Sequence, residues 1–213
     1  MKIVSVILAR AGSKGIPSKN IIDLNGKPLI SYTIQASQKS NVDSTWVSTD
    51  CPKIKEISKK FNANVLDRPK EISGDFSNSE EALLHFTKKI DFDILVFIQP
   101  TSPLLEARDI NVGIKLLLED NACSSVFSVY KQHWLPRWSL DIQPLDWDIE
   151  NRPMRQEVQE EYIENGAFYI TRKINLLTSK LRYSGTKNVV VMPYLRSFQI
   201  DTLDDLNLIK GLL

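Results

Sequence analysis

The feature that most constrains the fold is a series of short apolar runs, rich in β-branched residues, that alternate with segments of helical pattern. The runs lie at residues 2–9, 44–50, 93–100, 124–130, 166–170 and 187–193. Strands without polar alternation are typically buried on both faces, as in a parallel sheet covered by helices. Helical patterns lie between them, at about 28–39, 52–61, 77–89, 104–119 and 202–212. We therefore expect an α/β fold, a three-layer sandwich with a mostly parallel mixed sheet.

The chain length predicts one domain carrying an insertion. A single core can grow to roughly 250 residues before it splits, and the chain has 213. Segment 131–164 breaks the strand and helix pattern, and it holds three of the four tryptophans, Trp134, Trp138 and Trp147. Exposed aromatic residues in such an excursion are typical of a subunit contact. We predict a dimerisation arm at about 131–164, with a plain surface meander as the alternative.

Charge and cysteine content exclude several classes of protein. The chain has 27 Lys and Arg against 26 Asp and Glu, a net charge of +1, which does not favour binding to nucleic acid or to an anionic membrane. Two cysteines without paired spacing predict neither a disulfide framework nor a zinc site. The apolar run at 2–9 is too short to span a bilayer, so we interpret it as a buried strand. We expect a cytoplasmic protein.

The loop that follows the first run, within ILARAGSKGIPSKN, has the composition of an anion site. Gly12 and Gly15 allow backbone amides to approach an oxyanion, and Arg10, Lys14 and Lys19 can balance the charge of a triphosphate. Ligands of parallel sheets bind at the carboxyl ends of strands, where this loop lies. The spacing fits neither GxxxxGK[ST] nor GxGxxG. On these residues alone, a solvated connector remains open.

Polar residues also follow later strands. Asp50 follows STWVST, where it also precedes a proline as a helix cap would, and Arg68 follows ANVLD. The stretch QPTSP begins at Gln99, and its two prolines make a rigid loop that presents the hydroxyls of Thr101 and Ser102. Rigid polar loops at strand ends favour positioning of a ligand.

Seven motifs occur in a fixed order: ILARAGSKGIPSKNI, NGKPLI, VSTD, LDRPKEISGD, FIQPTSPL, ENGAFYI and QIDTLDDL. With them the chain resembles the acylneuraminate cytidylyltransferase family, the CMP-sialic acid synthetases, over about 1–130 and 155–213. The resemblance implies a Rossmann-like fold of the nucleotide-diphospho-sugar transferase type. It also implies transfer of CMP from CTP to the anomeric hydroxyl of a nine-carbon 2-keto sugar acid (nonulosonic acid), with release of pyrophosphate. Mg²⁺ and a homodimer are implied as well.

The resemblance also implies roles for individual residues. Arg10 and Lys14 would contact the triphosphate as catalytic groups, and Asp201 would hold Mg²⁺. The nucleotide-binding positions would be Ala9, Gly12, Ser13, Lys19, Asn20, Arg68 and Ser79. The sugar-binding positions would be Gln99, Arg155, which would pair with the sugar carboxylate, and Tyr169, for which a core aromatic is the alternative.

One position departs from the pattern of the family. Many sialic-acid members carry Asp-x-Asp before the last helix, whereas this chain has Gln199-Ile200-Asp201. A neutral amide contributes no charge to a metal site, so we expect weaker metal affinity. Mg²⁺ held by Asp201, water and triphosphate is one interpretation, and a catalytically weakened CTP-binding homologue is another. A cytidylyltransferase for 3-deoxy-manno-octulosonate is a further alternative.

Overall fold

The computed structural model describes residues 1–12 and 15–213, which form a mixed sheet covered by helices on both faces. The sheet has seven strands in the order β5-β4-β1-β6-β8-β7-β9. Neighbouring strands are parallel except β8, which is antiparallel to both β6 and β7. Their bounds are β1 (Ile3–Leu8), β4 (Ser44–Thr49), β5 (Asn64–Asp67), β6 (Ile94–Ile98), β7 (Cys123–Gln132), β8 (Glu161–Arg172) and β9 (Thr186–Val191). The predicted mostly parallel mixed sheet is confirmed.

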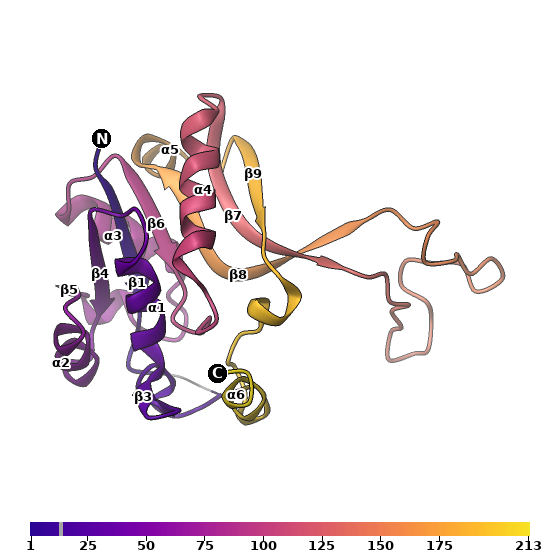
Figure 1. Ribbon diagram of the computed structural model, residues 1–213, viewed down its shortest axis with the longest axis horizontal. Helices are drawn as coiled ribbons and strands as arrows, with labels where there is room; N and C mark the ends of the chain where they lie inside the picture. Colours follow the sequence, from indigo (N-terminus) through magenta and orange to yellow (C-terminus); the bar gives the residue numbers. More distant parts are fainter. Residues whose placement is uncertain (13–14) are drawn as a thin grey trace.

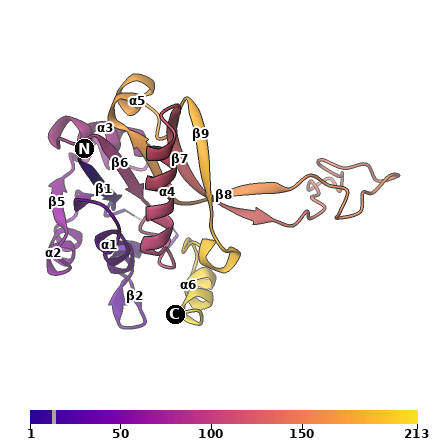
Figure 2. The same ribbon diagram turned by 45° about the horizontal axis from the view of Figure 1, so that its top comes forward.

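Two apolar clusters on opposite faces of the sheet hold the layers together. One joins the sheet to α1 (Leu29–Gln38), α2 (Pro52–Lys60) and α4 (Ala107–Glu119). The other joins it to α3 (Ser79–Lys89) and α5 (Lys173–Ser179). Figures 1 and 2 show these two helical layers on either side of the strands. The three-layer sandwich is therefore confirmed, with β1 and β6 at its centre.

All five predicted helices are present, the last being α6 (Leu203–Lys210), and α5 is an addition that the patterns did not indicate. The Asn25-Gly26 turn joins two short antiparallel strands, β2 (Asp23–Leu24) and β3 (Lys27–Pro28). Both turn residues have positive φ, 50° and 82°, as a tight hairpin turn requires. Among residues 1–12 and 15–213, three short 3₁₀ helices complete the elements: η1 (Lys19–Ile21), η2 (Lys70–Ile72) and η3 (Tyr194–Ser197). No helix among the described residues is long and apolar enough to cross a bilayer.

Strand β8 is longer than the apolar run predicted, and it passes through Asn165-Gly166 without turning back. Gly166 has φ +68°, and a Cβ there would lie 2.5 Å from the side-chain nitrogen of Gln199. Only glycine fits this conformation and this close approach. The local Asn-Gly signal therefore marks a bend inside the strand, beside the candidate site described below, where a hairpin turn would be expected from the dipeptide alone.

Segment 131–164 leaves the body of the molecule as an arm (Figures 1 and 2). Strands β7 and β8 form its base and stay paired as far as Gln132 and Glu161. Beyond them, the ring of Trp147 lies edge-on to those of Trp134 and Trp138, and Arg152 lies over two of the three rings. The arm thus has a small aromatic centre of its own, while its role in dimerisation stays a prediction.

Candidate active site

A cleft of about 310 Å³ lies at the carboxyl ends of β1, β5 and β6. It is the edge at which parallel strands present ligand-binding loops. Its lining comes from residues far apart in the chain: Leu8, Arg10, Gly12, Lys19, Asn20, Arg68, Ile72, Ser73, Gly74, Ser77, Asn78, Ser79, Phe97, Gln99, Pro100, Thr101 and Asp201. The fold therefore gathers basic, amide, hydroxyl and carboxylate groups in one open cleft.

Most of the residues singled out in the sequence meet in this cleft. Those that line it are Arg10, Gly12, Lys19, Asn20, Arg68, Ser79, Gln99 and Asp201. Ser13 and Lys14 lie outside the described residues. The sequence did not indicate as site residues those from the end of η2 to the start of α3 that also line the cleft, Ile72, Ser73, Gly74, Ser77 and Asn78. The sequence signal that could have indicated them is the predicted start of α3, because the first backbone N–H groups of a helix have no helical partners and can bind a ligand.

Three of the proposed site residues do not line the cleft. Ala9 is fully buried in the core, and its N–H donates to the carbonyl oxygen of Ser48 at 3.1 Å. Tyr169 is only 3% exposed. Arg155 is exposed and belongs to the arm, which points away from the body (Figure 1). None of these three residues is placed to contact a ligand in the cleft of its own chain.

Tyr169 supports the wall of the cleft from behind. Its ring stacks on that of Phe97 with centroids 5.4 Å apart, and Phe97 lines the cleft. Its hydroxyl donates to Glu164, and burial, together with that carboxylate, raises the pKa of Tyr169. Arg182 lies over both rings and pairs with Glu80 through two bonds of 2.7 and 2.9 Å. The core-aromatic interpretation of Tyr169 fits this arrangement.

Hydrogen bonds fix the described parts of the opening loop. Arg10 pairs with Asp75 at 2.7 Å, and the side-chain amide of Asn20 donates to the Arg10 carbonyl oxygen at 3.1 Å. The N–H of Ala11 donates to Asp50 Oδ1 at 3.0 Å. Asp50 is therefore not the helix cap that its sequence position suggested, since α2 begins after Cys51 without a side-chain capping bond. The carboxylate of Asp50 accepts from the distant N–H of Ala11, where a helix cap would accept from the first turn of α2.

Lys19 and Asp201 pair opposite charges across the cleft. Lys19 Nζ lies 2.7 Å from Asp201 Oδ1, although 182 positions separate the two in sequence. A Cβ on Gly15 would lie 2.5 Å from the Asp201 carbonyl oxygen, so the opening loop packs directly against this residue. The last motif of the chain therefore meets the first, and the ammonium group of Lys19 balances the carboxylate.

The metal site implied by the resemblance can be tested against the donors present. Among residues 1–12 and 15–213, no group of three or more His, Cys, Asp or Glu side chains is placed to hold a metal ion. Mg²⁺ commonly takes one or two carboxylates and completes its shell with water and substrate phosphates. The exposed carboxylate of Asp201 fits that mode as a single protein ligand. An all-protein metal cage does not fit these residues.

Gln199 uses its side-chain amide to hold the protein together. Its Nε2 donates to the carbonyl oxygen of Asn165 at 2.5 Å and lies 3.3 Å from Ser102 Oγ. The backbone N–H of Ile200 donates to the carbonyl oxygen of Thr101 at 2.9 Å. The segment that carries Asp201 is thereby tied both to the bend in β8 and to the loop after β6.

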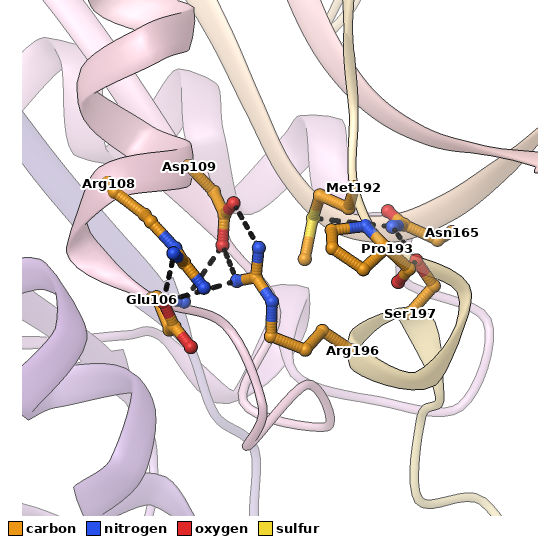
Figure 3. A network of polar contacts seen from close by, with 8 residues as sticks. All are labelled: Glu106, Arg108, Asp109, Asn165, Met192, Pro193, Arg196 and Ser197. Carbon is orange, nitrogen blue, oxygen red and sulfur yellow. Dashed lines mark hydrogen bonds and ion pairs between the residues drawn. The ribbon is translucent and has the colours of Figure 1, made fainter.

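A network of polar contacts anchors the same segment further upstream (Figure 3). Arg196 pairs with both carboxylate oxygens of Asp109 at the start of α4, and Asp109 is only 5% exposed. The hydrogen bonds to that carboxylate raise the pKa of Arg196. The side-chain nitrogen of Asn165 donates to Ser197 Oγ at 2.9 Å. Helix η3 is thus held on two sides before the chain reaches Asp201.

Two polar side chains of the cleft wall have buried atoms without a hydrogen-bond partner in the described part of the chain. Arg68 is 8% exposed, its Nε and Nη2 atoms have no acceptor, and its nearest carboxylate is Asp50 at 4.0 Å. Burial lowers the pKa of Arg68, and the charge of Asp50 offsets part of that effect. The other side chain is Thr101, whose Oγ1 is also unpartnered. Buried polar atoms normally have partners, so both suit a bound molecule rich in acceptors.

Solved structures of nucleotidyltransferases share the fold of this chain. A structure of CMP:2-keto-3-deoxy-manno-octonic acid synthetase complexed with CTP matches with a TM-score of 0.73 and 19% identity, over 100% of this chain and 98% of that one. The 4-diphosphocytidyl-2C-methyl-D-erythritol synthase from Anaerococcus prevotii matches with a TM-score of 0.65 and 15% identity, over 99% and 98%. At these identities the likeness concerns the fold.

Sequence comparison places the chain within that class. A sequence model described as cytidylyltransferase matches residues 4–212, and the chain belongs to this family. The N-acylneuraminate cytidylyltransferase of Oncorhynchus mykiss is 40% identical over 177 residues, which cover 79% of this chain and 40% of that protein. That of Escherichia coli O18:K1:H7 is 31% identical over 216 residues, 97% of this chain and 51% of that protein. The chain spans about half the length of the curated relatives it matches. The resemblance read from the seven motifs is confirmed.

Proposed function

We propose that the chain is a CTP-dependent nucleotidyltransferase that transfers CMP to the anomeric hydroxyl of a nine-carbon 2-keto sugar acid and releases pyrophosphate. The observation that carries the proposal is the cleft itself, which gathers Arg10, Lys19 and Arg68 with Gln99 and Asp201 at the carboxyl ends of the central strands. Cationic side chains suit a triphosphate, an amide suits the acceptor sugar, and a carboxylate suits a metal ion that neutralises phosphate charge. CTP is an intracellular nucleotide, so the proposed place of action is the cytoplasm.

Phosphoryl and nucleotidyl transfer depend chiefly on positioning and on stabilisation of charge. Arg10 and Lys19 would hold phosphate oxygens, and each now contacts a carboxylate, Asp75 or Asp201, that phosphate oxygens can replace. Arg68 and Ser79 would bind the cytosine and the ribose. The hydrogen bonds that fix Ala11 and Asn20 keep the loop in shape before the nucleotide arrives. The attacking hydroxyl can then meet the α-phosphate in line.

We assign the Mg²⁺ ligand to Asp201, together with water and phosphate oxygens. When bound, the ion would neutralise charge that develops on the phosphates. Gln199 is engaged with Asn165 and Ser102, so it supports the segment that carries Asp201. Because the amide of Gln199 is used to hold this segment, we prefer the interpretation in which Asp201 is the only protein carboxylate on the metal ion.

The sugar acid would bind beside Gln99, and its carboxylate calls for a cation. Arg155 is the cation that the resemblance assigns to it, yet Arg155 lies on the arm and outside the cleft of its own chain. Arg155 can therefore fill this role only if the arm of a second copy reaches the cleft. We propose a homodimer on this ground, and light scattering that finds only monomer at micromolar concentration would count against it.

The function is tested by incubating the protein with CTP, Mg²⁺ and one acceptor at a time, and measuring pyrophosphate and CMP-sugar together. The acceptors are N-acetylneuraminic, legionaminic, pseudaminic and 3-deoxy-manno-octulosonic acids, with a no-sugar control. We expect equimolar products with one of the three nine-carbon acids. Products only with the eight-carbon acid would favour the alternative that the CTP-bound structural neighbour suggests. CTP binding without product would favour a catalytically weakened homologue.

A further inference from the structure

The hydroxyl of Thr101 is a polar group that the proposed roles leave unused. Thr101 follows β6, lines the cleft and is 8% exposed. Its Oγ1 is buried and has no hydrogen-bond partner in the part of the chain that the structure describes. Its carbonyl oxygen accepts from the N–H of Ile200 at 2.9 Å, which fixes the backbone of Thr101 beside Asp201.

The fold gives no reason for a hydroxyl at this position. Burying a hydroxyl without a partner costs stability, and valine has nearly the same shape without that cost. The neighbouring hydroxyl of Ser102 differs in this respect, because Gln199 Nε2 lies 3.3 Å from it. The backbone bond to Ile200 would also survive the loss of the Thr101 hydroxyl. What remains is the cleft, where a ligand can supply the missing partner.

The surroundings of Thr101 indicate the chemistry of that partner. Thr101 lines the cleft together with Gln99, which we assign to the sugar acid, and its backbone is bonded to Ile200, the neighbour of Asp201, which pairs with Lys19. This is the junction at which the phosphates of CTP and the carboxylate of the acceptor would meet. Both groups carry anionic oxygens that accept hydrogen bonds, and a hydroxyl can donate to either.

We infer that Thr101 Oγ1 donates a hydrogen bond to an anionic oxygen of the bound substrates, either a phosphate of CTP or the carboxylate of the sugar acid. The inference rests on the proposed function and adds a binding residue to it. A hydrogen bond to a charged group changes affinity by roughly 10- to 100-fold. The loss of the hydroxyl should therefore weaken substrate binding while leaving the empty protein as stable as before.

The test compares Thr101→Val with two controls in the full chain. Thr101→Ser keeps the hydroxyl. Ser48→Ala removes another buried hydroxyl without a partner among the described residues, one that does not line the cleft. The melting temperature is measured without ligand, the dissociation constant of CTP by calorimetry, and the KM for the sugar acid at saturating CTP. We expect Thr101→Val to melt at or above the wild-type temperature.

We also expect Thr101→Val to raise one of the two constants by about 10- to 100-fold, with Thr101→Ser and Ser48→Ala within about threefold of wild type. A raised dissociation constant for CTP identifies the phosphate as partner, and a raised KM alone identifies the carboxylate. The inference is overturned if Thr101→Val keeps both constants, if Thr101→Ser loses as much as Thr101→Val, or if Thr101→Val melts clearly lower. Failure of the wild-type protein to bind CTP would instead overturn the proposed function, and it would show before any variant is compared.

Discussion

Replacement of Arg68 by Met should separate ligand binding from stability. Arg68 is 8% exposed, and two of its guanidinium nitrogen atoms have no acceptor among the described residues. A buried charge without a full set of hydrogen bonds costs free energy, and methionine fills a similar volume without that cost. We expect the free energy of unfolding of the empty Arg68→Met protein to stay within about 1 kcal/mol of wild type, or to rise.

The cost should appear when CTP binds. Hydrogen bonds to charged groups contribute about 1.5–3 kcal/mol each, and Arg68 has two donor groups to offer. Allowing for partial compensation, we expect a loss of about 3 kcal/mol in CTP binding, which is roughly a 100-fold rise in the dissociation constant. Urea denaturation gives the first quantity and calorimetric titration with CTP gives the second.

Arg68→Lys is the matched control, because it keeps the charge but loses the planar fork of donors. Its affinity for CTP should lie between those of wild type and Arg68→Met. The reasoning would be refuted if Arg68→Met bound CTP as tightly as wild type while losing several kcal/mol of stability. That result would make Arg68 a structural residue.

Three further predictions concern the segment that carries Asp201. Asp201→Asn should raise the Mg²⁺ concentration needed for half-maximal pyrophosphate release at least about tenfold, because it removes the carboxylate assigned to the metal; an unchanged requirement would contradict that assignment. Gln199→Glu should destabilise the protein by about 2 kcal/mol in urea denaturation, because a carboxylate cannot donate to the carbonyl oxygen of Asn165, and a gain in Mg²⁺ affinity at unchanged stability would show that Gln199 faces the metal. Arg196→Met leaves the buried carboxylate of Asp109 without its cation and should cost about 3 kcal/mol in the same assay, whereas a loss below about 1 kcal/mol would show that the pair adds little.

The sheet and its helices could be predicted because their signals are local. Apolar runs such as 93–100 mark buried strands wherever they pair, and helix periodicity over 104–119 needs no knowledge of neighbours. The direction of β8 could not be predicted in this way, because it depends on how the chain returns to the sheet from the arm. The polar 161–165 stretch also belongs to β8, where pairing with β7 overrides its composition.

Most members of the candidate site could be predicted from the sequence, but their contacts could not. Asp50 looked like a helix cap, since nothing nearby in sequence reveals the N–H of Ala11 that it accepts from. The pair of Lys19 and Asp201 joins opposite ends of the chain, so only the resemblance brought them together in advance. The resemblance also assigned Arg155 to the sugar, but a motif does not tell which subunit supplies a residue. The unpartnered hydroxyl of Thr101 is visible only in three dimensions.

The most direct test of the account is a crystal structure of the protein with CTP and Mg²⁺. We predict that the triphosphate lies against Arg10 and Lys19, that Arg68 donates to the nucleoside, and that Asp201 faces the metal ion. A nucleotide bound outside this cleft, or within it with Arg68 still unpartnered, would contradict the assignment of the cleft as the site of CMP transfer.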